Sequence, residues 1–209
     1  MGSNVGWEKS NFQIFWAEIA PCNHILQIYE DDKVFLDSLE GFVGSGILAG
    51  DAVIVIATAL HLIELNRRLL NQGFDLNALK ANNQYLPLNA QETLAQFMVK
   101  DFPDEDLFNE TVNKIIKQAR SRNRNVRAFG EMVAILWAQG KNGATVRLEH
   151  LWNKFQEQEE FSLFCAYPKI GFTDDPHNSL LDICKCHSQI IGGWAKPSTE
   201  IYYQYQTNR

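Results

Sequence analysis

The sequence lacks several features that would assign this chain of 209 residues to a common functional class. No apolar run reaches the roughly 20 residues that a membrane-spanning helix needs, so we expect no transmembrane segment. Basic residues are not in excess, since 19 Lys and Arg stand against 25 Asp and Glu, a formal net charge of -6. This balance gives no electrostatic reason for binding to nucleic acid or to an anionic membrane. We therefore expect neither of them as a direct partner.

Cysteine is scarce, and the four residues Cys22, Cys165, Cys184 and Cys186 do not have the spacing of a disulfide framework. The N-terminal stretch also lacks the basic region followed by an apolar region that marks a secretion signal. Reduced thiols are then the default state. We expect a cytoplasmic protein.

Glycine is missing where a phosphate-binding loop would require it. The first predicted strand, HILQIYE (24–30), is followed by Asp31, Asp32 and Lys33. A P-loop uses glycines to wrap successive backbone N–H groups around phosphates, and Lys and Ser or Thr follow them. The acids at this corner would repel phosphate. We therefore do not expect ATP hydrolysis, and we expect a protein without enzymatic activity or a cofactor.

The glycine-rich segment GFVGSGILAG (41–50) roughly matches a dinucleotide-binding fingerprint. Such a fingerprint follows a strand and opens a helix, whereas these glycines precede the strongest predicted strand. We interpret them as sites of close helix packing and as a C-terminal helix cap.

Apolar runs alternate with amphipathic segments along almost the whole chain. The predicted strands cover 24–30, 51–58, 84–90, the beginning of 125–140, 161–168 and 200–206. The predicted helices cover about 32–49, 60–73, 91–100, 104–121, 143–157 and 178–193. The β-branched run DAVIVIAT (51–58) indicates a strand buried on both faces of a parallel sheet, and Pro87 places its strand near an edge. This alternation predicts a single doubly wound α/β domain.

In such sheets, ligands bind outside the carboxyl ends of the strands. This rule places the loops Tyr29–Asp32, Gly130–Met132 and Tyr167–Phe172 on one rim, with Thr58 as a further member. We call this the carboxyl rim. The sequence therefore predicts a binding site there.

Glu131 is the acid of greatest interest, because it follows the apolar strand VRAFG and precedes the apolar segment MVAILW. A buried carboxylate needs a partner or a neutral state. Arg127 and His24 are candidate partners, so Glu131 is either part of a structural ion pair or a ligand contact. The apolar side chains near the same strand end that could line a pocket are Phe129, Met132 and Trp137.

Two cysteine patterns allow weaker alternatives. Cys184 and Cys186 would point to opposite sides of a helix, so they cannot both ligate one ion without unwinding it. Buried helical cysteines are favoured over a metal site with His187. Cys165 could form a nucleophile pair with a histidine, but its strand is apolar, where cysteine commonly acts as a small hydrophobic residue. We expect no metal site.

Five segments occur in an order and spacing that resemble the MEDS family of prokaryotic sensory domains: HILQIYED, GFVGSGILAGDAVIVIAT, VRAFGEMVAILW, RLEHLWN and FSLFCAYP. Members of this family include methanogen and methylotroph regulators, among them the regulator of dichloromethane dehalogenation. The resemblance implies a single three-layer RecA-like domain with a mostly parallel central sheet, similar to the circadian-clock ATPases but without a working P-loop. It divides the chain into an N-terminal extension (1–19), a sensory domain (20–193) and a C-terminal tail or added edge strand (194–209).

The resemblance also implies site residues. The recurrent family positions fall on His24, Tyr29, Glu30, Arg127, Gly130, Glu131, Glu149, Asn153, Cys165, Tyr167 and His187. The family often has His-Pro where this chain has His187-Ser188. Combined with the carboxyl rim, this gives an expected set of ligand contacts: His24, Tyr29, Glu30, Arg127, Phe129, Glu131, Met132, Trp137, Cys165 and Tyr167.

We therefore expect a non-enzymatic sensory domain for signal transduction that binds a small molecule, such as a simple hydrocarbon derivative, at the carboxyl rim. Two alternatives remain open, namely a residual nucleotide-binding protein or hydrolase of the RecA-like class, and a pure interaction scaffold. The modules found beside family members imply a separate signalling partner, such as a histidine kinase or a transcription regulator. A homodimer is also an expected form.

Overall fold

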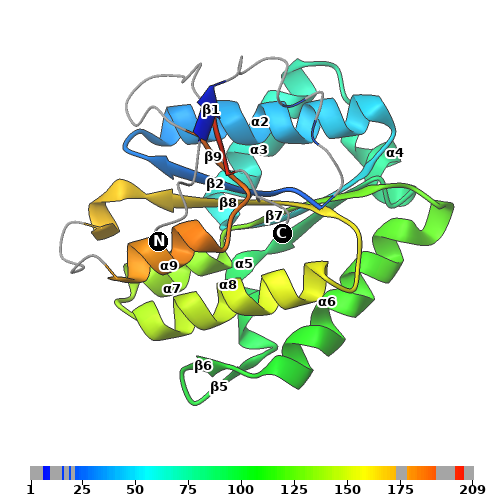
Figure 1. Ribbon diagram of the computed structural model, residues 1–209. Helices are drawn as coiled ribbons and strands as arrows, with labels where there is room; N and C mark the ends of the chain where they lie inside the picture. Colours follow the sequence, from blue (N-terminus) through cyan, green and yellow to red (C-terminus); the bar gives the residue numbers. More distant parts are fainter. Residues whose placement is uncertain are drawn as a thin grey trace.

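A computed structural model describes residues 22–172 and 178–191, the strand segments 7–9 and 201–204, and the single residues Trp16 and Ile19. Its main sheet has the strand order β1-β10-β9-β2-β8-β7-β3-β4 (Figure 1). The strands of this sheet, in chain order, are β1 (Trp7–Lys9), β2 (His24–Tyr29), β3 (Ala52–Ala57), β4 (Tyr85–Asn89), β7 (Val126–Gly130), β8 (Ser162–Pro168), β9 (Gln189–Ile191) and β10 (Ile201–Gln204). The six strands from β9 to β4 are all parallel. β10 and β1 extend the β9 edge in antiparallel pairing.

Helices cover both faces of this sheet and complete three layers (Figure 1). On one face lie α2 (Asp32–Ala49), α3 (Ala59–Asn71) and α4 (Leu76–Ala81). On the other face lie α5 (Ala90–Ala95), α6 (Glu105–Ala119), α7 (Met132–Ala138), α8 (Asn142–Gln156) and α9 (Asn178–Lys185). The predicted three-layer RecA-like α/β fold with a mostly parallel sheet is confirmed.

The strand sequences explain their places in the sheet. Every residue of β2 and of β3 is buried, as the continuous apolar runs predict for strands covered by helices on both faces. Pro87 lies in β4, the outermost strand on its side. An edge strand leaves one side of its backbone unpaired, so the missing N–H of proline costs no ladder hydrogen bond there.

The connections create a crevice between β2 and β8, which are neighbours in the sheet. The chain leaves β2 for α2 on one face and leaves β8 toward α9 on the opposite face. The loops after two such strands diverge, which opens a crevice at the carboxyl ends where α/β proteins bind ligands. A similar divergence occurs between β3, which leads to α3, and β7, which leads to α7.

Two predicted helices are shorter than expected. The first, predicted at 91–100, is α5, which ends at Ala95 and is followed by a hairpin of β5 (Met98–Val99) and β6 (Phe102–Pro103). Lys100 and Asp101 form the turn with φ of 49° and 66°. Positive φ at both central residues is the geometry of a tight hairpin turn, so the helical periodicity is interrupted here.

The second, predicted at 178–193, is α9, which ends at Lys185. Gln189–Ile191 instead forms β9, in parallel pairing with β2. The free edge of β2 offers backbone hydrogen bonds and apolar contacts that outweigh the helical pattern. The strand predicted at 200–206 is present as β10.

The glycines of 41–50 have the predicted structural roles. Gly50 caps α2 with a φ of 86°, a left-handed conformation that glycine adopts without a Cβ penalty. A Cβ on Gly46 would approach Val53 Cγ2 to 2.9 Å and Arg127 Cδ to 3.0 Å. Close packing of α2 on the sheet therefore requires glycine at position 46.

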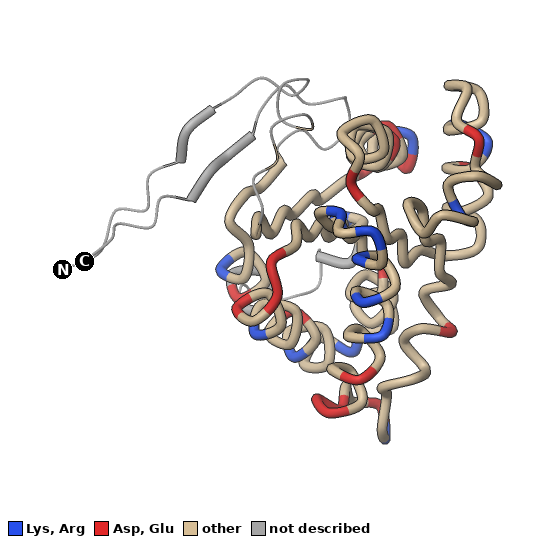
Figure 2. Tube along the Cα trace, turned by 90° about the vertical axis from the view of Figure 1, so that its right-hand side faces the viewer, with Lys and Arg blue, Asp and Glu red and all other residues tan. Residues whose placement is uncertain are grey.

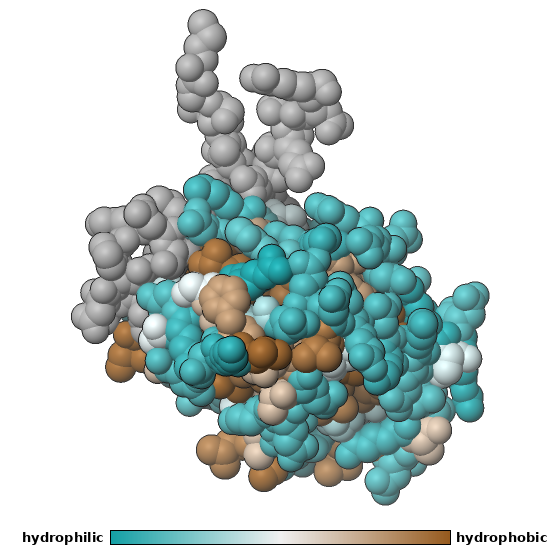
Figure 3. Space-filling view, turned by 90° about the horizontal axis from the view of Figure 1, so that it is seen from below, coloured by the Kyte–Doolittle hydropathy of each residue, from teal (hydrophilic) through white to brown (hydrophobic). Residues whose placement is uncertain are grey.

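The surface mixes acidic and basic residues, and apolar side chains are exposed on its lower side. On the side shown in Figure 2, acidic and basic residues are interspersed along the helices. From below, apolar side chains gather near the middle of a mostly hydrophilic surface (Figure 3). Val99 and Phe102 of the hairpin and Leu107 of α6 are exposed apolar residues, and the hairpin lies at the bottom of the molecule in Figure 1. Among the described residues, no helix combines the length and apolarity needed to cross a membrane.

Candidate functional site

A cavity of about 480 Å³ lies at the carboxyl rim, in the crevice between β2 and β8. Its lining residues come from the two strand ends and the loops after them: Tyr29, Glu30, Asp32, Pro168, Lys169 and Ile170. Glu30 and Lys169 form an ion pair between the two loops. The cavity thus combines an apolar wall with charged groups of both signs.

The start of α2 beside this cavity is occupied by a carboxylate of the chain itself. Asp31 is the N-cap residue of α2, and its side chain accepts a hydrogen bond of 2.7 Å from the backbone N–H of Lys33. A helix N-terminus can bind phosphate only through N–H groups that are free to donate. The Asp31 carboxylate uses one of these donors and adds negative charge, so the local structure agrees with the missing P-loop glycines.

Glu131 connects the ends of β7 and β3 at the same rim. Its Oε2 accepts a 2.7 Å hydrogen bond from the backbone N–H of Thr58, the N-cap residue of α3. Its Oε1 lies 2.8 Å from Nδ1 of His61, in the first turn of α3. The side chain is buried, so both carboxylate oxygens have partners within the fold. Glu131 therefore forms an ion pair, one of the two roles considered from the sequence, and its partner is His61 in place of Arg127 or His24.

Three aromatic rings connect the cavity to this ion pair. Tyr29, which lines the cavity, stacks on Phe35 with ring centroids 4.8 Å apart. Phe35 contacts the His61 ring edge-on at 4.9 Å. Burial, followed by the charges of Glu131 and Asp32, raises the pKa of Tyr29, so its hydroxyl stays protonated and remains a hydrogen-bond donor.

Arg127 does not lie at the carboxyl rim. It is the second residue of β7, and its Nε donates a 2.6 Å hydrogen bond to Asp51, just before β3. Its Nη1 donates to the backbone oxygen of Trp16 at 2.8 Å. The predicted pairing of Arg127 with Glu131 is therefore wrong, because the two residues lie at opposite ends of the same strand. The position of Arg127 at the beginning of its strand was a signal for this.

His24 is also remote from Glu131, because it begins β2 at the amino end of the sheet. It belongs to a buried polar group with Glu149, Cys165 and His187, which we call the His–Glu–Cys–His cluster. His24 Nε2 lies 3.4 Å from Cys165 Sγ and 3.5 Å from Glu149 Oε2. Each of the four offers a potential ligand atom, and these atoms all lie within 4.8 Å of one another.

Further hydrogen bonds hold the cluster in place. His24 Nδ1 lies 2.7 Å from Asn153 Oδ1, and His187 Nδ1 lies 2.6 Å from the backbone oxygen of Ile183. The Tyr167 hydroxyl donates a hydrogen bond to Glu149. The rings of His24 and His187 pack with centroids 3.9 Å apart.

Burial keeps the members of this cluster uncharged in the absence of a bound cation. It raises the pKa of Glu149 to about 8, against the opposing effect of the hydrogen bonds from Tyr167 and Cys165. It lowers the pKa of His24 to about 4, although the hydrogen bond with Asn153 opposes this. Burial also raises the pKa of the Cys165 thiol. The structure thus brings Cys165 and a histidine together, but an uncharged buried thiol is not an activated nucleophile.

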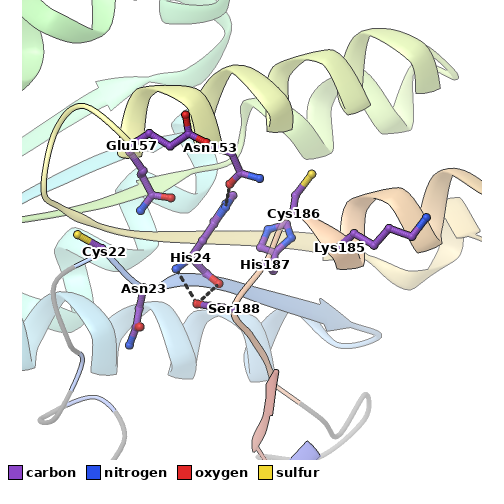
Figure 4. A pocket seen from close by; sticks show the side chains of 10 residues that line it. Cys22, Asn23, His24, Asn153, Glu157, Lys185, Cys186, His187 and Ser188 are labelled. Atoms are coloured by element: carbon purple, nitrogen blue, oxygen red, sulfur yellow. Dashed lines mark hydrogen bonds between the residues drawn. The ribbon is translucent and has the colours of Figure 1, made fainter. Parts of the chain in front are cut away.

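A second cavity, of about 550 Å³, lies next to the cluster at the amino end of β2. Its lining residues include His24, Asn153, Cys186, His187 and Ser188. Figure 4 shows Asn153 and His187 reaching the His24 side chain from α8 and from the segment after α9. This cavity gives the two histidines an approach from the outside.

The remaining predicted contacts lie in the core. Phe129 packs between the sheet and α2, whereas Met132 and Trp137 pack on the opposite face. Of the ten predicted contacts, Tyr29 and Glu30 line the rim cavity, His24 lines the cavity beside the cluster, and Arg127 lines a smaller cavity of about 270 Å³ at the amino end of the sheet. His61, Lys169 and Ile170 are rim residues that the sequence reasoning did not single out. Lys169 and Ile170 belong to the loop Tyr167–Phe172, which the sequence placed on the rim, whereas His61 lies in the first turn of a predicted helix and had no such signal.

Comparison with known proteins assigns this chain to a family. No curated protein matches the sequence. A solved structure from Pyrococcus horikoshii OT3, reported as a structural study, is similar with a TM-score of 0.55 and 16% identity, over 87% of this chain and 86% of that one. At this identity the likeness shows the fold alone. The sequence model of MEDS, the methanogen/methylotroph, DcmR sensory domain, matches residues 23–188. That range covers most of the chain, so the resemblance inferred from the sequence is confirmed, and the chain belongs to the MEDS family of sensory domains.

Proposed function

We propose that this protein is a non-enzymatic sensory domain that binds a small, mostly apolar molecule in the rim cavity between β2 and β8. The observation that carries the proposal is the position of this cavity at the crevice where the connections after β2 and β8 diverge to opposite faces. Open α/β sheets bind their ligands at such crevices. The family supports a sensory role, and the cavity supplies a place for the ligand.

The lining favours a neutral molecule with a polar end. Tyr29, Pro168 and Ile170 provide apolar surface, whereas Glu30 and Asp32 provide acceptors. A phosphate would meet these two acids and the Asp31 carboxylate at the start of α2, whereas the basic residue of the lining, Lys169, is paired with Glu30. A small alcohol or a similar hydrocarbon derivative can place its chain on the apolar side and donate a hydrogen bond to an acid.

The signal would leave the cavity through α3. Tyr29 stacks on Phe35, and Phe35 contacts His61 in the first turn of this helix. His61 in turn pairs with Glu131, which follows β7. The exposed apolar residues of α3 are Leu60, Ile63 and Leu70. A separate signalling protein, such as a histidine kinase or a transcription regulator, or a second copy of the chain could bind this face. A ligand shifts such an equilibrium only if it binds one conformation more tightly than the other.

A thermal-shift panel of small alcohols, halocarbons, organic acids and nucleotides with magnesium tests the proposal. A ligand at about 100 times its Kd should add about 2.7 kcal/mol of stability. Glu30→Gln and Ile170→Ala should reduce the shift from an active compound, because both residues line the cavity. Matched controls are Glu159→Gln, which alters another surface ion pair, and Leu48→Ala, which alters another exposed apolar residue.

Three outcomes would contradict the proposal. The first is an active compound whose shift is unchanged by both cavity variants. The second is stabilisation by ATP and magnesium together with phosphate release, which would support the residual nucleotide hydrolase. The third is the absence of stabilisation across the panel, which would favour the interaction scaffold.

The transmission of the signal through α3 has a separate test. His61→Ala should still bind the ligand but should lose any ligand-dependent change in assembly, which size-exclusion chromatography measures.

A further inference from the structure

We propose that the His–Glu–Cys–His cluster is a binding site for one divalent transition-metal ion, with Zn²⁺ as its natural occupant. The four side chains come from separate parts of the fold: the start of β2, the middle of α8, the middle of β8 and the segment after α9. Imidazole, thiolate and carboxylate are the donors that zinc takes in proteins. The site is distinct from the rim cavity, so it stands independently of the proposed ligand.

The separations between donor atoms approach those of a tetrahedral centre, and all of the potential ligand atoms lie within 4.8 Å of one another. Zinc bonds of about 2.0–2.3 Å place neighbouring ligand atoms roughly 3.3–3.8 Å apart in a tetrahedron. His24 Nε2 lies 3.4 Å from Cys165 Sγ and 3.5 Å from Glu149 Oε2. His187 Nε2 lies 3.8 Å from Glu149 Oε1. An ion could therefore bind with small side-chain adjustments.

The two histidines are held with the correct nitrogen toward the centre. His187 Nδ1 faces the backbone oxygen of Ile183, which can only accept, so Nδ1 carries the proton and Nε2 carries a lone pair. Asn153 Oδ1 fixes His24 in the same tautomer. Metal-ligating histidines almost always donate their other N–H in this manner, and ligating carboxylates are themselves hydrogen-bonded. Tyr167 supplies that bond to Glu149.

His187 provides a second, independent observation. Its side chain is fully buried, and within the described residues its Nε2 atom has no hydrogen-bond partner. A buried acceptor without a partner is costly to the fold, and this atom is directed at the other three potential ligands. A metal ion bound at Nε2 would remove that cost.

The charges also balance for a divalent ion. One thiolate and one carboxylate carry two negative charges, and two neutral imidazoles add none, so a divalent cation gives a neutral buried centre. Among the residues that the structure describes, no lysine or arginine pairs with Glu149. A buried charge requires such compensation. The cavity beside His24 and His187 supplies the route of entry.

A centre with four protein ligands is of the structural type, because catalytic zinc sites keep one position open for water. It would join the β9 edge of the sheet to α8 through His187 and Glu149. The ion would thereby hold the end of α9 against the sheet. Binding releases the protons of Cys165 and, when it is protonated, of Glu149 to solvent, and no oxidation or reduction is involved.

Metal analysis and cobalt substitution of the full chain test this assignment. Protein purified under reducing conditions should carry about one zinc per chain, or bind one after treatment with a chelator and addition of Zn²⁺. With Co²⁺, the stripped protein should show the intense visible bands of tetrahedral cobalt and a thiolate-to-cobalt band in the near ultraviolet. Cys165→Ser should abolish the near-ultraviolet band. Asn153→Ala should weaken zinc binding by about 10- to 100-fold, measured by competition with a chelating dye.

The chain offers matched controls. His150→Ala removes an exposed histidine of α8, and Cys184→Ser removes a thiol near the cluster that is not one of its four members. Both should leave the cobalt spectrum and the zinc affinity unchanged. The proposal would be overturned if the wild-type protein, which needs no substitution to fold, bound neither ion stoichiometrically. A near-ultraviolet band lost in Cys184→Ser but retained in Cys165→Ser would also overturn it.

Discussion

His61 Nδ1 lies 2.8 Å from Glu131 Oε1, so the first turn of α3 is joined to the end of β7 at the carboxyl rim. The same carboxylate accepts the backbone N–H of Thr58. One acid therefore connects two neighbouring strand ends and the helix that follows one of them. This arrangement has consequences for stability that can be measured.

The first prediction concerns pH. Burial favours the neutral form of His61, but the hydrogen bond to Glu131 and the charges of Glu131 and Asp32 outweigh it and raise its pKa above 6.5. The folded protein thus holds this proton more tightly than the unfolded chain does. The resulting stabilisation is complete below the unfolded pKa and is lost as the pH rises through the raised folded pKa. In urea unfolding, the difference in stability between wild type and His61→Gln should be larger at about pH 6 than at about pH 8. A difference independent of pH would show that the pair does not titrate in this range.

The second prediction concerns Glu131 itself. Glu131→Ala leaves the Thr58 N–H without its buried acceptor, which should lower the free energy of unfolding by about 1–3 kcal/mol. Glu131→Gln should cost less, because the amide oxygen can still accept that bond. Denaturant unfolding measures both, and Glu110→Ala, at an exposed ion pair with Lys114, serves as the control that should change little. Equal losses for the alanine and glutamine variants would mean that the charge, not the Thr58 bond, is responsible.

The third prediction concerns the buried ion pair of Arg127 and Asp51 at the opposite end of β7. Arg127→Ala leaves a nearly buried carboxylate uncompensated and should cost about 3–5 kcal/mol of unfolding free energy. In that background, the further change Asp51→Ala should cost much less than it does in wild type. A double-mutant cycle measures the coupling, which should lie in the range of about 0.5–3 kcal/mol. Additive effects would show that the two side chains contribute separately.

The fourth prediction compares two glycines inside α2. Alanine is favoured over glycine within a helix by about 1 kcal/mol. At Gly44 the nearest atom to an added Cβ is the flexible Gln72 side chain at 3.4 Å, so Gly44→Ala should be neutral or stabilising. At Gly46 the Cβ would come within 2.9 Å of Val53 Cγ2, so Gly46→Ala should be destabilising. The melting temperature should therefore fall for Gly46→Ala and stay the same or rise for Gly44→Ala, and equal shifts would contradict the packing argument.

Local sequence patterns were sufficient to predict most of the secondary structure and the layers of the fold. The run DAVIVIAT predicted a strand buried on both faces, Pro87 predicted an edge, and Gly50 predicted a helix cap. Each of these depends on a residue's own backbone preference or on periodicity over a few positions. The helix predicted at 178–193 is too long because the helical period of the sequence continues past Lys185. In the structure, Gln189–Ile191 pairs with the edge of β2 and forms a strand. Such pairing is a non-local contact.

The candidate site was only partly predictable for the same reason. The sequence brought Tyr29, Glu30 and Glu131 to one rim, because the carboxyl ends of parallel strands share an edge. It also placed His24 and Arg127 there, although they are the first residue of β2 and the second residue of β7 and therefore lie at the amino end. His61 was missed because a histidine in the first turn of a helix has no distinguishing local pattern.

The sequence by itself determined that the chain is an α/β protein with a buried parallel sheet and without the glycines of a phosphate loop. These properties follow from hydrophobic periodicity and from the conformational limits of single residues. Only the tertiary structure decided which polar side chains meet. Glu149 reaches Cys165 because α8 packs across β8, and His187 reaches His24 because β9 pairs with β2. These four groups are buried together because segments distant in the sequence pack against one another. No local pattern of residues can therefore predict the cluster.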